Sequence, residues 1–254
     1  MLQHCKSILI GLLCGASGMA WAQSCSSSSA QRPMVVVELY TSQGCSSCPP
    51  ADRWLSSLQA RDDVLAMAFH VNYWNHLGWK DPFATAQTTE RQVRLKAVLG
   101  GDYVYTPQVT INGVDERAWA RRQAHDLQPL KVRGAPTVVL QRQGETVTAQ
   151  VGAQIGAQGN ASAAGAPLRW AGYWVVLQDA QNTRVVAGEN AGRQLRNDHV
   201  VVHYVPVPAW SSAQVQNFKL AAALAPGQRA AFVVTQDNGI VPVQAVLLAC
   251  ANQS

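Results

Sequence analysis

The stretch of sequence that decides the predicted fold is MVVVELYTSQGCSSCPPAD, which occupies residues 34–52. Its first seven residues are apolar and rich in β-branched side chains apart from Glu38, as in a strand buried on both faces. A loop with Cys45 and Cys48 follows, and then two prolines. Proline suits the first turn of a helix, where its missing N–H group would have had no helical partner. The stretch therefore predicts a buried strand, a Cys-x-x-Cys loop and a helix.

The position of the two cysteines before a helix predicts chemistry at their sulfur atoms. At a helix N-terminus, unpaired N–H groups and the positive end of the helix dipole favour the thiolate, which is the reactive form of cysteine. In such an arrangement the first cysteine is normally exposed, and the second lies inward and resolves the mixed disulfide. We therefore predict Cys45 as the nucleophile and Cys48 as the resolving thiol.

The segments that follow predict strands and helices in alternation. Residues 64–71 and 108–111 predict strands, whereas residues 85–99 and 117–127 predict helices. Asn112-Gly113 is typical of a two-residue hairpin turn. Alternation of this kind favours an α/β layered domain, which we place over residues 33–134.

The composition changes after Pro129, and from residue 135 onward short β-rich runs are separated by turn residues. No clear helix interrupts these runs, which is typical of a small sandwich or barrel. Residues 154–167, rich in Gly, Ala and Ser, predict a flexible loop within this part. We therefore predict an all-β, sandwich-like C-terminal domain over residues 135–250.

The N-terminal residues predict a secretory signal peptide. Lys6 precedes the apolar run ILIGLL at residues 8–13, and Ala-Trp-Ala occupies residues 20–22. A positive region, a short apolar core and a small-residue cleavage site are the features of such a signal. The run is shorter than the ~20 residues that a membrane-spanning helix needs. We predict cleavage after Ala22 and a mature chain that is periplasmic or secreted, with no membrane attachment.

Export determines which cysteines remain in the mature chain. Two of the six cysteines leave with the signal, and four stay. Four cysteines in an oxidising compartment allow three pairings. Cys45 and Cys48 are close enough to pair, which leaves Cys25 and Cys250 near the two ends of the mature chain. Because chain ends often lie close together, we predict Cys25–Cys250 beside Cys45–Cys48, with the other pairings left open.

The composition excludes some classes of function. Charged residues make up 14% of the chain, well below the usual ~25%, so the net charge of +5 does not indicate a nucleic-acid-binding protein. The basic residues Arg117, Arg121, Arg122 and His125 are typical of a solvated face. No glycine-rich phosphate loop, Ser–His–Asp set or paired-carboxylate site stands out. We therefore predict no bound cofactor, no metal and no nucleic-acid partner.

Three strings carry a resemblance to a known family. They are VELYTSQGCSSCPPAD at residues 37–52, FHVNYWNHLGWKDPF at residues 69–83 and YTPQ at residues 105–108. Together they resemble a bacterial secreted family catalogued as domain of unknown function 1223, and residues 188–193 and 233–245 look like its C-terminal part. The resemblance implies a thioredoxin-like domain with a helical insertion at residues 33–134, and it names no substrate. Asn72 and Asn75 stand where we expect acids in the family, so no role of those acids carries over.

The thioredoxin-like fold that this resemblance implies adds two site residues. Pro107, after Thr106, would follow a cis peptide bond and lie against the cysteine pair, although only ~5–6% of such bonds are cis. Glu38, seven residues before Cys45, would accept the proton of the inner cysteine. Strand alternation also allows Glu38 to face solvent or a basic neighbour.

Other interpretations of these residues stay open. The Cys-x-x-Cys pair also fits a structural disulfide, and a copper site with His70 and His76 is a further alternative, whereas zinc needs more ligands than one visible pair. His70 also fits a core histidine. An aromatic cluster or rim is predicted from Trp74, Trp79 and Phe83. A turn held by local hydrogen bonds is predicted from Glu189, Asn190 and Arg193.

The predicted function is that of an exported thiol–disulfide oxidoreductase acting on protein or small-molecule thiols. The alternative is a non-catalytic thioredoxin-like binding module, in which the pair is a structural disulfide or holds a metal. The sequence indicates neither the direction of electron flow nor the oligomeric state.

Overall fold

The computed structural model describes residues 24–152 and 169–250. The predicted signal peptide and the predicted flexible loop at residues 154–167 lie outside these ranges. Within the two ranges, no helix is long and apolar enough to cross a membrane.

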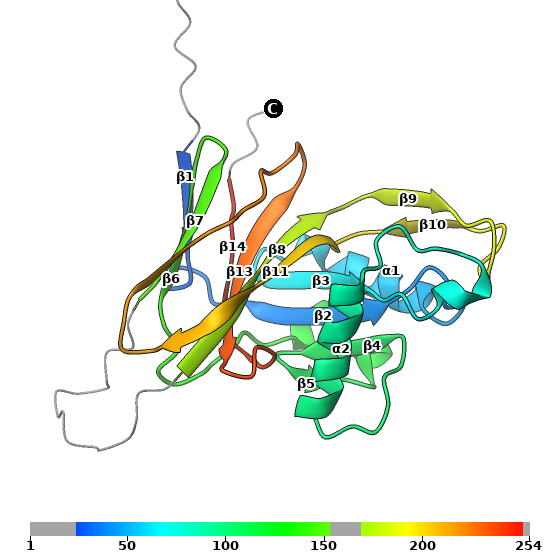
Figure 1. The fold of residues 1–254 in the computed structure, drawn as a ribbon, viewed down its shortest axis with the longest axis horizontal. Coiled ribbons are helices and arrows are strands. Elements are labelled where there is room, and N and C mark those ends of the chain that lie inside the picture. Colours follow the sequence, from blue (N-terminus) through cyan, green and yellow to red (C-terminus); the bar gives the residue numbers. More distant parts are fainter. Residues whose placement is uncertain (1–23, 153–168, 251–254) are drawn as a thin grey trace, which may run out of the picture.

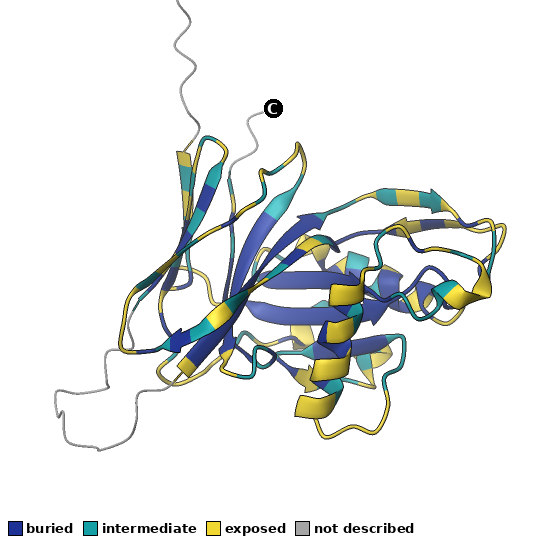
Figure 2. Ribbon diagram, in the orientation of Figure 1, coloured by how far each residue is buried: buried dark blue, intermediate teal, exposed yellow. Residues whose placement is uncertain are grey.

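An eight-stranded mixed sheet runs through the molecule, in the order β14-β13-β8-β11-β3-β2-β4-β5 (Figure 1). Its central strands β2 and β3 are parallel, and every residue of both is buried (Figure 2), as expected for strands covered on both faces. β11 meets β3 in parallel at Val200 and Ala68, and the other neighbours are antiparallel. In sheet order the strands span Pro242–Leu247, Arg229–Gln236, Arg169–Gln178, Val200–Ser211, Val64–His70, Val35–Thr41, Gln108–Ile111 and Val114–Asp115.

A smaller sheet and a separate hairpin complete the β structure. The smaller sheet has the order β1-β6-β7-β12, and its apolar side chains share a core with Trp174 of β8 and Phe232 of β13. β9 and β10 pair only with each other among the described strands. These strands span Ser24–Ser28, Val138–Gln143, Thr146–Val151, Gln216–Lys219, Gln181–Arg184 and Gln194–Asn197.

Two α-helices, α1 (Pro49–Ser57) and α2 (Ala86–Val98), cover opposite faces of β2 and β3. Val35, Val37 and Leu39 of β2 share a core with α1, and the alternate residues Val36 and Tyr40 share a core with α2. Successive side chains of a strand point to opposite faces, so this single strand serves both cores. α2 begins at a capping box, in which Thr85 and Thr88 each accept the other's backbone N–H.

The predicted helix at residues 117–127 was wrong. Two short 3-10 turns, Trp119–Arg121 and Ala124–Asp126, occupy this segment, because Arg122 and Gln123 between them are extended. The carbonyl of Arg122 accepts a hydrogen bond from Trp54 Nε1 of α1 at 2.9 Å instead of bonding along a helix. A tertiary contact thus replaces the helical bond.

The predicted fold class, an α/β thioredoxin-like domain followed by an all-β sandwich-like domain, was also wrong. The structure is mostly β, with two α-helices in the described ranges, and strands from before and after residue 135 join one sheet. β11 lies against β3 and continues the sheet into β8, β13 and β14. The alternation of strands and helices along the chain does not show which distant strand completes a sheet. The sequence pattern therefore predicted an α/β part and an all-β part where the structure has one shared sheet.

Candidate functional site

The Cys45–Cys48 disulfide lies where β2 ends and α1 begins. Cys48 is the N-cap residue of α1, and its carbonyl accepts the N–H groups of Ala51 and Asp52 at 2.9 and 3.1 Å. The Cys45 sulfur lies 3.4 Å from Ser47 Oγ. The positive end of the helix dipole favours a thiolate when this disulfide is opened. The second cysteine pair, Cys25–Cys250, is also bonded in the structure.

Both cysteines of the pair are buried, with 0% of either residue exposed. The sequence pattern predicted an exposed Cys45, and this prediction was wrong. Only Ser46 and Ser47 between the cysteines are exposed. A segment far away in the chain, the turn that connects β9 and β10, contacts the main chain of this loop.

Residues 188–192, which we call the cap, form the tip of the β9–β10 hairpin and bind the disulfide loop. Asn190, itself fully buried, donates from Nδ2 to the carbonyls of Gln43 and Cys45, both at 2.9 Å. Glu189 accepts the backbone N–H of Ser46 at 2.9 Å, and this bond lowers the pKa of the Glu189 carboxyl. The sequence analysis took Glu189 and Asn190 as local turn residues, because about 145 positions separate them from the cysteines and no local signal points that far.

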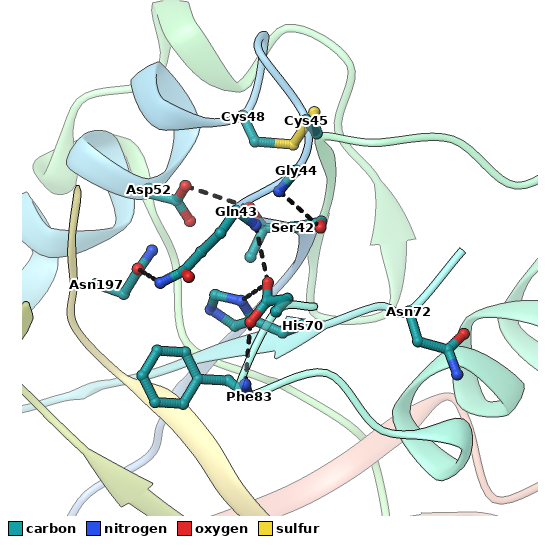
Figure 3. Close-up of polar contacts among 12 residues, drawn as sticks. Ser42, Gln43, Gly44, Cys45, Cys48, Asp52, His70, Asn72, Phe83 and Asn197 are labelled. Atoms are coloured by element: carbon teal, nitrogen blue, oxygen red, sulfur yellow. Dashed lines mark hydrogen bonds and ion pairs between the residues drawn. A yellow bond between two sulfur atoms is a disulfide. The ribbon is translucent and has the colours of Figure 1, made fainter. Parts of the chain in front are cut away.

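Gln43 connects the disulfide loop to three other parts of the site, a role that the sequence analysis missed. Its backbone N–H donates to Asp81 at 2.8 Å, and its Nε2 donates to Asn197 of β10 at 2.9 Å (Figure 3). Its Oε1 accepts Trp79 Nε1 at 3.2 Å. The loop is therefore fixed on the side that faces the interior.

A buried acid lies in the first turns of the same helix. Asp52 is four residues after Cys48, a spacing that places both on one face of α1. Its Oδ2 accepts Thr41 Oγ1 at 3.2 Å, and its Oδ1 is buried without a protein partner. Burial raises the pKa of Asp52 to about 6, against the smaller opposing effects of His70 and Thr41. The sequence analysis missed Asp52, although its helical spacing from Cys48 was a readable signal.

His70 lies beside this acid in the core, as one of its two predicted interpretations required. Its Nδ1 is 2.7 Å from Asp81 Oδ2, and its Nε2, like Asp52 Oδ1, is buried without a protein partner. Burial alone would lower the pKa of His70, but the Asp81 carboxylate outweighs burial and raises it. Figure 3 shows Asp52 and His70 on the inner side of the disulfide loop. Phe83 packs edge-on against the His70 ring at 5.2 Å.

Glu38, the acid predicted to serve the cysteines, lies on the α2 face of β2, opposite α1. Its Oε1 accepts Arg91 at 2.5 Å and Tyr173 at 2.7 Å, and its Oε2 accepts Tyr40 at 2.9 Å. Both oxygens are thus occupied by a basic neighbour and two phenols. Asp52 therefore lies on the helix that begins at Cys48, and Glu38 lies on the opposite face of β2.

Pro107 follows a cis peptide bond, as predicted, and precedes β4. The next residue, Gln108, pairs with Tyr40 at the end of β2, so Pro107 is close to the start of the disulfide loop. Trp74 bridges the two segments: its Nε1 donates to Thr106 Oγ1 at 2.8 Å, and its Cβ is 3.0 Å from where a side chain on Gly44 would begin. Trp74 thus joins the Pro107 segment to the loop and would have to shift to admit a side chain at position 44.

The alternative copper site depended on His70 and His76. His76 is exposed and hydrogen-bonds through Nδ1 to the Tyr73 carbonyl at 2.6 Å, whereas His70 is bound to Asp81 in the core. Among residues 24–152 and 169–250, no group of three or more His, Cys, Asp or Glu side chains is arranged to hold a metal ion.

The fold and the site define a mostly β protein with a covered Cys-x-x-Cys disulfide at a helix N-terminus. The chain belongs to the family described as protein of unknown function DUF1223, whose profile matches residues 36–236. No curated protein matches the chain.

Two solved structures resemble the chain. A protein of Agrobacterium tumefaciens, solved in a structural genomics programme, is 28% identical with a TM-score of 0.63, and the match covers 88% of this chain and 96% of that one. HBP35 of Porphyromonas gingivalis is 14% identical with a TM-score of 0.50, over 87% of this chain and 76% of that one. The second match indicates similarity of fold alone.

Proposed function

We propose that this protein carries out thiol–disulfide exchange on protein or small-molecule thiols, with Cys45–Cys48 as the exchanging disulfide. The observation that supports this most directly is the placement of the pair at the start of α1 with the buried, proton-binding Asp52 one turn further on. The helix start stabilises a cysteine thiolate, and Asp52 has a pKa of about 6, close to the pH at which exchange takes place.

The proposed reaction has two steps. A substrate thiolate attacks Cys45 Sγ, the Cys45–Cys48 bond breaks, and Cys48 leaves as a thiolate that takes a proton through Asp52. A second substrate thiolate then attacks the substrate sulfur of the mixed disulfide and releases Cys45. The substrate loses two electrons and two protons and becomes a disulfide, and the pair gains both. In the reverse direction Asp52 removes the proton from Cys48, whose thiolate then resolves the mixed disulfide.

The alternative function is a non-catalytic binding module in which Cys45–Cys48 only stabilises the loop. The observation that favours it is the complete burial of both cysteines. Structural disulfides of exported proteins have reduction potentials below about −300 mV, which separates the two proposals.

The first experiment measures the equilibrium of the pair against glutathione. Exchange activity predicts a reduction potential above about −250 mV, loss of turnover in Cys45→Ser and a stable mixed disulfide trapped by Cys48→Ala. A potential below about −300 mV, with no trapped species in Cys48→Ala, would favour the structural alternative. Cys25→Ser, which removes the other pair and leaves Cys45–Cys48 intact, serves as the matched control.

We also propose that the protein is exported with its first 22 residues removed. The sequence features at residues 6–22 support this, and so do two disulfides, since they persist in oxidising compartments. Mass spectrometry of the protein expressed with its own N-terminus in a bacterial host should detect a periplasmic or secreted chain beginning at Gln23. A full-length chain retained in the cytoplasm would contradict export.

A further inference from the structure

We infer that the cap closes the exchange site and moves aside to admit substrate to Cys45. This inference rests on the proposed function and adds a gating step to it. It starts from a conflict between the burial of Cys45 and any direct attack on its sulfur atom.

The cap is held by polar bonds to the main chain of the disulfide loop. Asn190 satisfies two carbonyls, those of Gln43 and Cys45, and Glu189 satisfies the N–H group of Ser46. Arg193 donates to Asn190 Oδ1 at 2.9 Å and so fixes the orientation of the amide. Water or the main chain of a substrate can replace these hydrogen bonds when the cap moves. Apolar contacts in a core could not be replaced in this way.

The cap has pivots at both of its ends. Gly188 and Gly192 have φ angles of +73° and +82°, a backbone region that glycine enters without strain. Two residues before Gly188, Val186 is 70% exposed, whereas Val185 before it is fully buried and marks the fixed end of β9. A rearrangement limited to residues 188–192 therefore leaves the paired strands β9 and β10 in place.

The base of the hairpin, in contrast, is fixed. The N–H of Ala180 donates to Asp198 Oδ1 and the N–H of His199 donates to Asp179 Oδ1, both at 2.7 Å. Asn197 at the end of β10 also accepts Gln43 Nε2. The hairpin is thus anchored where it leaves the main sheet, so the gate movement is confined to its tip.

Opening the cap removes the partners of the Gln43 carbonyl and the Ser46 N–H, and it leaves the Cys45 carbonyl with only the N–H of Cys48. An extended peptide segment that carries a cysteine presents the complementary donors and acceptor. The cap and such a substrate segment therefore compete for the same groups.

The test is the rate at which a water-soluble phosphine reduces Cys45–Cys48, followed by alkylation and mass spectrometry of the whole chain. If the cap gates access, the observed rate reaches a plateau as the phosphine concentration rises, because opening becomes limiting. Asn190→Ala removes the two hydrogen bonds to the loop carbonyls, together with the one from Arg193, and should raise the plateau about tenfold. The matched control is Asn182→Ala on β9, whose exposed amide bonds only to the Ala180 carbonyl and which should leave the plateau unchanged.

Three results would overturn the gate. These are a rate that rises linearly with phosphine at every concentration, an equal plateau in Asn190→Ala, and a plateau that rises with urea as steeply as the rate of global unfolding. If Asn190→Ala does not fold, Glu189→Ala replaces it, since Glu189 is exposed and loses only its bond to Ser46. The measurement is kinetic and uses a strong reductant, so it gives a result even where the glutathione equilibrium excludes exchange activity.

Discussion

Glu38 and Asp52 are buried carboxylates on opposite faces of the same part of the sheet, and their surroundings differ. Glu38 accepts three hydrogen bonds, one of them from the fully buried Arg91. The Arg91 guanidinium also stacks 4.2 Å from the Tyr173 ring and reaches the Gly239 carbonyl. This acid therefore joins β2, β8, α2 and the β13–β14 turn.

Asp52 accepts one side-chain hydrogen bond, and its second oxygen has no protein partner. A buried carboxylate that is not bonded to a cation is costly in the charged form, which is why burial raises the pKa of Asp52 to about 6. The comparison shows how one sheet uses two acids differently. A fully bonded ion pair fixes the packing, and a partly bonded acid remains able to exchange a proton.

The largest expected effect is on the Glu38 side. Arg91→Met leaves Glu38 buried without its cation and should lower the free energy of unfolding by about 3–5 kcal/mol. Urea denaturation at pH 7 measures this. The control is Arg94→Met on the exposed face of α2, for which we expect a change within about 0.5 kcal/mol. Equal losses in the two variants would contradict a structural role for the Glu38–Arg91 pair.

The next effect is a pH dependence of stability that Asp52 causes. The folded pKa of about 6 exceeds the ordinary 3.8, so the folded chain binds this proton more tightly than the unfolded chain. The resulting stabilisation is full below pH 3.8 and is lost as the pH rises through about 6, a loss of up to about 3 kcal/mol. Asp52→Asn has no such proton, and the difference between the two proteins isolates it from His70. Parallel stability curves from pH 4 to 8 would refute the raised pKa.

The exchange rate should show a smaller effect of the same residue. Asp52→Asn should slow resolution of the mixed disulfide by about 10–100-fold, since general acid–base catalysis contributes at least that much, and should abolish an inflection near pH 6. Asp62→Asn, on the exposed turn after α1, is the matched control and should keep the wild-type rate. An unchanged pH profile in Asp52→Asn would mean that solvent, and not Asp52, exchanges the proton with Cys48.

The smallest expected effect comes from Thr41, whose hydroxyl donates the one side-chain hydrogen bond that the Asp52 carboxylate accepts. The Thr41 hydroxyl lowers the pKa of Asp52, so Thr41→Val should move the inflection of the exchange profile upward by about half a pH unit. Glutathione exchange between pH 5 and 8 measures this. Ser56→Ala, whose hydroxyl bonds to the Asp52 carbonyl and not to its carboxylate, should leave the inflection in place. A downward shift in Thr41→Val would mean that the hydroxyl does not stabilise the charged form.

The sequence predicted local features of this molecule better than distant ones. The apolar run before Cys45, the prolines after Cys48 and the helix near residues 85–99 each carry their own pattern, and all three elements are present. The predicted fold class was wrong because Val200 pairs with Ala68, and nothing in the sequence of either strand indicates the other as its partner. The side of β2 on which Glu38 points followed from alternation only once the positions of both helices were known. Contacts between the cap and the loop had no sequence signal at all.

The Cys25–Cys250 bond has a consequence for the order in which the protein matures. Its two cysteines are 225 positions apart, whereas those of the Cys45–Cys48 pair are three apart. During synthesis both cysteines of the short pair are present after a fifth of the chain has emerged, but the long bond must wait until Cys250 follows. Until then Cys25 is the free thiol nearest in sequence to the Cys45–Cys48 pair, so an early mispairing with Cys45 or Cys48 has to be reversed before the ends are joined. Correct maturation of this protein therefore requires that Cys25 is not bonded to Cys45 or Cys48 when Cys250 emerges.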